Sequence, residues 1–221
     1  MAEQLIFDLP AYEALGREDF FVSDANREAV AKVTKPEAWP DNKLVLVAPA
    51  RGGKSHLARI FEQQTDALRL SAYDLPVGLT PNTPVIVENM DRLPRAAEET
   101  MFHLHNALRP TGHPLLMTAR TPPARWPIAL PDLASRMQAT TPIHIQDPDD
   151  ELLGVLIAKL FADRQVIPSP NVIRFIVSRM DRSFKFAADV VEALDKTALQ
   201  EKTAVTMKIA GQVLDRLSST E

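Results

Sequence analysis

The chain has 221 residues, of which 45% are hydrophobic and 24% charged, and this balance excludes fibrous and intrinsically disordered proteins. It contains no cysteine, which excludes disulfides, thiolate zinc sites and cysteine catalysis and is typical of a reducing cytosol. Its net charge of −4 is unfavourable for a dedicated nucleic-acid surface, because affinity for phosphate backbones comes mainly from lysine and arginine. We therefore expect a cytoplasmic globular protein whose contact with DNA is weak or indirect.

The first residues of the chain predict neither a secretory leader nor a membrane anchor. Acidic Glu3 and Asp8 stand where a leader would carry basic residues. No apolar run in the sequence approaches the roughly 18 residues that span a bilayer. We expect no contact with a membrane, and we interpret residues 1–18 as an N-terminal tail.

Short apolar runs then alternate with helical patterns or proline-rich connections. This alternation is typical of an α/β domain with a parallel sheet, which we place over residues 19–146. The runs that predict strands are 44–48, 67–70, 84–88, 114–118 and 142–145.

A glycine loop follows the first of these runs and is the most informative motif of the chain. It consists of Ala48-Pro49-Ala50-Arg51-Gly52-Gly53-Lys54-Ser55, and a helical pattern begins at His56. Backbone N–H groups of such a loop bind phosphate, the lysine adds positive charge, and the serine hydroxyl can hold Mg²⁺. Ala48 departs from the strict pattern, which has glycine six residues before the lysine. The flanking strand and helix favour a phosphate site over an ordinary strand-to-helix turn.

The run at 84–88 ends in Glu88, which Asn89 follows. Nucleotide hydrolases place the carboxylate that holds Mg²⁺, and the residue that polarises water, at the end of such a strand. Glu88 can serve as a Mg²⁺ ligand, but Asn89 cannot accept a proton. We therefore predict that general-base catalysis is missing here. The alternative is a plain strand end with a solvated acid.

Two later positions carry weaker signals. Thr118 ends the run at 114–118, where its hydroxyl can sense a γ-phosphate or position water, although a lone threonine at a strand end is more often structural. Arg136 ends a short helical segment just before the last strand. Its guanidinium can stabilise transition-state charge on a phosphate held by another molecule, as arginine fingers do, or it can form an intramolecular salt bridge.

Only helical patterns follow residue 146, so we expect a small helical domain over 147–221. Asp147-Pro148 predicts a helix whose N-cap is the aspartate and whose first residue is the proline, and Ser169-Pro170 predicts a second helix in the same way. Two further helices are expected over about 183–200 and 206–217.

As a set, these motifs resemble the DnaA-type branch of the AAA+ proteins, and more closely its Hda-type regulatory members. The resemblance covers 19–217. The segments that carry it are Asp19 to Asn26, the phosphate loop with His56-Leu57, Glu88-Asn89, Thr118 to Pro123, and Leu133 to Arg136.

The resemblance implies a five-stranded parallel sheet sandwiched by helices, a helical lid, and ADP or ATP held between them. Val22 and Asn26 match the positions that line the adenine pocket in this family. Lys185 falls near the arginine with which the lid helix senses nucleotide, and a lysine there puts that contact in doubt. The resemblance also makes Arg136 an arginine finger that acts in trans, on a partner or within a self-assembly.

The N-terminal tail resembles the short peptides that dock on the bacterial DNA polymerase sliding clamp, and Hda-type proteins carry such a peptide at this place. In Gln4-Leu5-Ile6-Phe7-Asp8-Leu9-Pro10, Gln4 would pin one end while Leu5, Phe7 and Leu9 fill an apolar groove. The alternative is a strand that packs on its own domain.

The resemblance therefore implies a negative regulator of replication initiation. It would bind adenine nucleotide, join the DNA-loaded clamp and stimulate hydrolysis of ATP bound to the DnaA initiator, without being an efficient ATPase itself. DnaA initiators carry a further DNA-binding region after the lid, so direct origin recognition is not expected. The alternatives are an autonomous AAA+ ATPase and a DnaA-family adaptor that recruits another protein.

Overall fold

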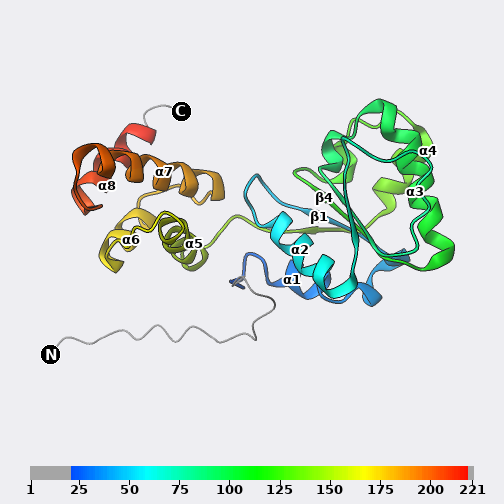
Figure 1. The fold of residues 1–221 in the computed structure, drawn as a ribbon, viewed down its shortest axis with the longest axis horizontal. Coiled ribbons are helices and arrows are strands. Elements are labelled where there is room, and N and C mark those ends of the chain that lie inside the picture. Colours follow the sequence, from blue (N-terminus) through cyan, green and yellow to red (C-terminus); the bar gives the residue numbers. More distant parts are fainter. Residues whose placement is uncertain (1–20, 219–221) are drawn as a thin grey trace.

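The computed structural model describes residues 21–218, which form an α/β part followed by a helical part (Figure 1). The predicted tail, with its clamp-binding peptide from Gln4 to Pro10, lies outside these residues. No helix of the described part is long and apolar enough to cross a membrane.

A five-stranded parallel sheet forms the centre of the α/β part, with strand order β2-β3-β4-β1-β5. All five residues of β1 are buried, as expected for a parallel strand covered on both faces. This sheet, its flanking helices and the helical part that follows confirm the predicted fold class. The strands are β1 Lys43–Val47, β2 Leu68–Ser71, β3 Val85–Glu88, β4 Leu115–Ala119 and β5 Pro142–His144.

Helices cover both faces of the sheet (Figure 1). Successive strand residues point to opposite faces, so Leu44 and Leu46 pack with α1 (Arg27–Val33) and α2 (Lys54–Thr65) in one core cluster. Val45 and Val47 pack on the other side with α3 (Glu98–Thr111) and α4 (Pro131–Ala139). The connections contain 3₁₀ turns at Pro36–Ala38, Pro40–Asn42, Met90–Arg92, Arg95–Ala97 and Pro123–Arg125.

The helical part has a core of its own, formed by the apolar faces of its helices. Leu153, Phe161, Val191 and Val213 are among its buried side chains. The helices are α5 Asp150–Ala162, α6 Pro170–Val177, α7 Phe184–Glu201 and α8 Met207–Ser218.

The start of α5 differs from the prediction. Its N-cap is Asp149, whose side chain accepts a hydrogen bond from the Leu152 N–H at 2.7 Å, so the expected cap at Asp147 is wrong. The Gln146 N–H donates to the Ala25 carbonyl at 2.8 Å, which keeps the chain extended beyond β5 and moves the helix start two residues on. Ser169 and Pro170 do begin α6 as predicted.

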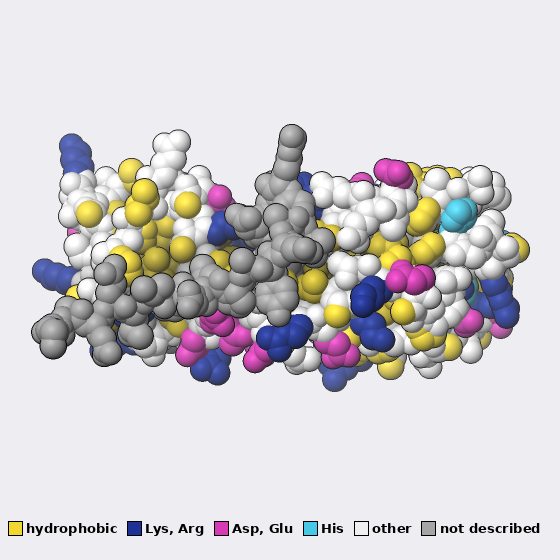
Figure 2. Space-filling view, turned by 90° about the horizontal axis from the view of Figure 1, so that it is seen from below, with side chains coloured by type: hydrophobic (Ala, Val, Ile, Leu, Met, Phe, Trp, Pro, Cys, Tyr) yellow, Lys and Arg dark blue, Asp and Glu magenta, His cyan; other side chains and the backbone are white. Residues whose placement is uncertain are grey.

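The surface charge is mixed on the face of the molecule drawn in Figure 2. Lysine and arginine side chains are interspersed there with aspartate and glutamate. The described residues that are visible in this view form no continuous basic area of the kind that binds a phosphate backbone.

His105 of α3 makes folding stability sensitive to acid. It is 6% exposed, and its Nδ1 has no hydrogen-bond partner within residues 21–218. Burial, with the charges of Lys43 and Arg136, lowers the pKa of His105 from 6.5 to about 4. Because the pKa of His105 is lower in the folded state, the unfolded state takes up a proton first as the pH falls. The free energy of unfolding is therefore unaffected by His105 above the unfolded pKa and falls as the pH drops toward 4.

We expect the free energy of unfolding to fall by about 3 kcal/mol more in the wild type than in His105→Leu between pH 6.5 and 4. Urea unfolding over this pH range measures the difference. His103→Leu, which changes an exposed histidine of the same helix, should keep the wild-type dependence. Equal pH dependence in His105→Leu and the wild type would contradict the prediction.

Candidate functional site

The loop between β1 and α2 leads into a helix whose first N–H groups have no side-chain cap. Arg51 and Gly53 have φ angles of 63° and 83°, in the left-handed region. Gly53 is the N-cap of α2 without a side-chain cap, so the Lys54 and Ser55 N–H groups begin the helix with no helical acceptor. Together with the helix dipole, such N–H groups make an anion-binding site.

Ala48 does not disturb this loop, although the strict motif has glycine there. It is buried, and it is not among the residues with positive φ. Gly52 is the tight position of the loop, because a Cβ there would lie 3.1 Å from the Ala48 Cβ and 3.1 Å from the Pro49 oxygen. The loop geometry is therefore compatible with alanine at its first position.

The Lys54 side chain folds back over the loop. Its Nζ donates to the carbonyl oxygens of Ala48 and Pro49, each at 2.7 Å. An ammonium group has three N–H donors, so one remains for a phosphate oxygen. Burial and the nearby Arg120 charge lower the pKa of Lys54, while Asp91 and Glu88 act in the opposite direction.

A pocket of about 210 Å³ lies between the loop and the helical part. Its walls combine apolar side chains with backbone and cationic groups, a mixture suited to a base joined to phosphates. Three segments line it: Phe21 and Asn26; Arg51, Gly52, Gly53 and His56; and Ile145, Leu152, Val155, Leu156, Lys159 and Phe184.

Asn26 lines this pocket, where adenine contact was predicted. Its Oδ1 accepts from the Ser23 N–H at 3.0 Å and its Nδ2 donates to the Phe21 carbonyl at 2.9 Å, so the amide shapes the segment 21–26. Phe21 lines the pocket in place of the predicted Val22, which packs against the core of the α/β part.

From the helical part, Phe184 and Lys159 line the pocket, but Lys185 does not. Lys185 is exposed and its Nζ lies 2.6 Å from the Asp189 Oδ2, one turn further along α7. Lys159 was not predicted. It follows Leu152 and Val155 at the spacing of one helix face, so the sequence held a signal for it.

Ser55 and Glu88, the two predicted metal ligands, lie together. The Ser55 hydroxyl donates to the Glu88 Oε1 at 3.0 Å. Arg69, which the sequence reasoning missed, donates to both carboxylate oxygens: Nη2 lies 3.0 Å from Oε1 and Nε lies 3.2 Å from Oε2. The two ligands have suitable chemistry for Mg²⁺, but a guanidinium cation already engages both carboxylate oxygens. In this arrangement the residues do not fit a magnesium ion at Glu88.

Thr118 and Asn89 meet at the carboxyl edge of the sheet. The Asn89 N–H lies 3.4 Å from the Thr118 Oγ1, and Thr118 is 2% exposed. Asn89 has a left-handed φ of 63°, which asparagine tolerates better than most residues. A carboxylate lies near Thr118, because Asp91 accepts a hydrogen bond at 3.1 Å from the N–H of Arg120, two residues further along the chain. No role was predicted for Asp91, or for Arg120 within the segment from Thr118 to Pro123.

Arg136 lies at the opposite edge of the sheet. It precedes β5, whose first residue Pro142 pairs with Val45 in the middle of β1, and its charge acts on Lys43 at the beginning of β1, whereas the phosphate loop follows the end of β1. The five residues of β1 separate the two edges by about 16 Å. Arg136 is half-buried, with its Cζ 5.0 Å from the Phe102 ring centroid, and within residues 21–218 it has no ion-pair partner.

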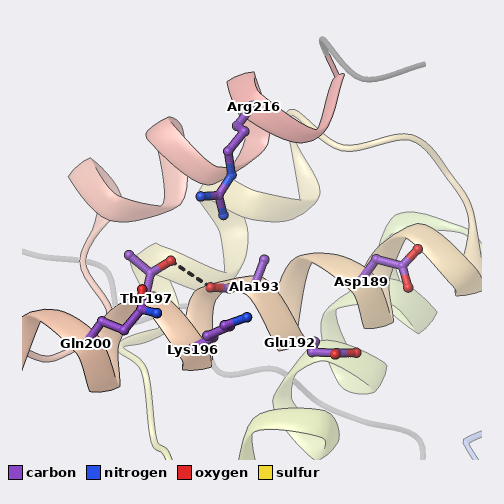
Figure 3. A pocket seen from close by; sticks show the side chains of 7 residues that line it. All are labelled: Asp189, Glu192, Ala193, Lys196, Thr197, Gln200 and Arg216. Atoms are coloured by element: carbon purple, nitrogen blue, oxygen red, sulfur yellow. Dashed lines mark hydrogen bonds between the residues drawn. The ribbon is translucent and has the colours of Figure 1, made fainter.

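A second hollow, of about 550 Å³, lies on α7 and α8 (Figure 3). Its side chains carry both signs of charge, and the Thr197 hydroxyl in it donates to the Ala193 carbonyl of its own helix at 2.8 Å. The phosphate loop contributes nothing to this hollow. It is lined by Asp189, Glu192, Ala193, Lys196, Thr197, Gln200 and Arg216.

Comparison with known proteins identifies the fold. No family model matches the sequence. The structure is similar to domain III of the Thermotoga maritima replication initiation protein DnaA, with a TM-score of 0.71 at 15% identity over 89% of this chain and 94% of that one. It is also similar to the Thermotoga maritima RuvB Holliday junction branch migration motor, with a TM-score of 0.65 at 17% identity over 89% and 70% of the two chains.

A third similar structure is a replication initiator DnaA bound to AMPPCP and single-stranded DNA. The TM-score is 0.64 at 13% identity, over 83% of this chain and 66% of that one. At these identities the likeness establishes the fold alone. The chain has an AAA+ fold like those of DnaA and RuvB.

Proposed function

We propose that this chain is an Hda-type negative regulator of replication initiation. It acts in the cytoplasm, binds ADP or ATP in the pocket beside the phosphate loop and joins the DNA-loaded sliding clamp through its N-terminal tail. There it stimulates hydrolysis of the ATP bound to a DnaA initiator, so that the initiator returns to its ADP form.

The observation that carries the proposal is the position of Arg136. It lies at the edge of the sheet away from its own phosphate loop, has no carboxylate partner among residues 21–218, and is only half-buried. A guanidinium so placed cannot serve the nucleotide of its own chain, but it can reach charge on a neighbouring molecule. The similarity to DnaA domain III supports a DnaA-type neighbour, since related folds can assemble through equivalent surfaces.

We expect the purified protein alone to hydrolyse ATP at well below about 1 per second, a slow rate for an enzyme. Asn89 cannot take a proton from water, and the nearby Asp91 carboxylate already accepts the Arg120 N–H, so we expect positioning and electrostatic effects to supply most of the rate. Steady-state phosphate release measures the rate. Turnover at or above that value would instead favour an autonomous motor.

The regulatory role is tested by following hydrolysis of ATP held by DnaA. We expect this chain to accelerate hydrolysis only when sliding clamp loaded on DNA is present. A variant with Gln4, Leu5 and Phe7 changed to alanine should lose clamp binding and stimulation but keep its melting temperature and its affinity for ADP. Such a short peptide should contribute little to the folded core.

Two results would favour other functions. Clamp binding without any acceleration of hydrolysis would favour a DnaA-family adaptor that recruits another protein. A loss of thermal stability in the triple-alanine variant would indicate that the tail packs on its own domain.

A further inference from the structure

The register of the sheet places Arg69 beside Glu88. β2 is the edge strand and pairs in parallel with β3, so that Ser71 lies opposite Glu88. Arg69 is two residues before Ser71 and therefore shares its face of the sheet. Helix α2 packs on this face, and the Oε2 of its Glu62 lies 3.2 Å from the Arg69 Nη1. Arg69 thus lies between a helix carboxylate and the carboxylate at the end of β3.

The contact with Glu88 is a bidentate fork, since Nε and Nη2 of Arg69 each donate to a different carboxylate oxygen. The Arg69 and Glu88 side chains are 27% and 21% exposed, so solvent screens the pair less than it would a surface pair. Hydrogen bonds that Arg69 donates to Glu88 and Glu62 raise the pKa of Arg69 above its ordinary value. The positive charge at this position is therefore permanent.

Both oxygens of Glu88 are engaged, because Oε1 also accepts from the Ser55 hydroxyl. A divalent cation on this carboxylate would have to break the fork or sit beside a guanidinium. Lys54 adds another positive charge nearby, since it is close enough for the Glu88 charge to act on its pKa in the upward direction. Like charges at these distances oppose each other, so the arrangement is unfavourable to a magnesium ion.

We propose that Arg69 takes the place of a divalent cation at this site, so that the chain binds a nucleoside diphosphate without magnesium. This inference rests on the nucleotide binding proposed above. The phosphate charge is then met by Lys54 and the loop N–H groups, while Glu88 and Ser55 stay bound to protein.

Isothermal titration with ADP tests the inference. The wild type should bind ADP no more tightly in magnesium chloride than in EDTA. Arg69→Gln frees the carboxylate of Glu88 and should bind ADP at least about tenfold more tightly with magnesium than without. Glu62→Gln is the matched control, because it removes the other partner of Arg69 and leaves the fork. It should behave as the wild type does.

Two outcomes overturn the inference while nucleotide binding stands: wild-type affinity that rises about tenfold or more with magnesium, or Arg69→Gln that binds ADP equally in both buffers. The wild-type comparison needs no variant, so it holds even if Arg69→Gln does not fold. If the wild type binds ADP in neither buffer, the proposed function is wrong, and so is this inference.

Discussion

Arg136→Ala should bind ADP and clamp normally yet fail to accelerate ATP hydrolysis by DnaA. An arginine finger acts on charge that develops in the transition state, and its loss costs about 10³- to 10⁵-fold in rate. The stimulated rate should therefore fall to that of the initiator alone. Hydrolysis of radiolabelled ATP bound to DnaA, with clamp loaded on DNA, measures this loss.

A structural role for Arg136 predicts a different result. Its contact with the Phe102 ring is worth about 0.5–1 kcal/mol at a partly exposed site, so alanine would lower stability a little. Stimulation per folded molecule would then be unchanged. Arg109→Ala is the matched control, because Arg109 is an exposed arginine whose charge also acts on Lys43. Retained stimulation by folded Arg136→Ala would rule out the finger.

Lys54→Ala should weaken ADP binding by about a hundredfold or more. Charge-assisted hydrogen bonds contribute about 1.5–3 kcal/mol each, and 1.4 kcal/mol is about tenfold in affinity. The substitution also leaves the carbonyls of Ala48 and Pro49 without their ammonium donor, so the loop loses part of what holds its shape. Isothermal titration with ADP measures the change.

Lys159→Ala provides the comparison for Lys54→Ala. Lys159 also lines the pocket but is exposed, and it lies on α5 rather than in the loop. We expect its loss to cost less than about tenfold in affinity, because solvent screens exposed charges. Circular dichroism checks that both variants are folded. If Lys54→Ala binds ADP as the wild type does, the loop is not the binding site.

Local patterns predicted the fold well. Apolar runs bounded by turn residues fixed the strands to within a residue or two, because a buried parallel strand needs a continuous apolar stretch. The start of α5 was missed because Asp147, Asp149 and Asp150 are all acceptable caps by type. The hydrogen bond from the Gln146 N–H to the carbonyl of Ala25, which is far away in the sequence, keeps the chain extended past Asp147, so that Asp149 is the N-cap.

The phosphate loop could be predicted because its chemistry lies in consecutive residues. The pairing of Arg69 with Glu88 could not, since it depends on which strand lies beside β3 and in which register. The position of Phe21 at the pocket depends in turn on how Asn26 folds the preceding segment. Such contacts arise from tertiary structure, and the sequence pattern around each residue carries no mark of them.

The crowding at Gly52 distinguishes this position from position 48, which accepts a side chain. At position 52 a methyl group would lie tightly against the Ala48 methyl and the Pro49 carbonyl oxygen, so the backbone there would have to shift to make room for it. Position 48 already accommodates a methyl group. The loop of this chain therefore keeps its geometry with alanine at the first position, and a definition of the motif by available volume includes this chain where a fixed string of letters does not.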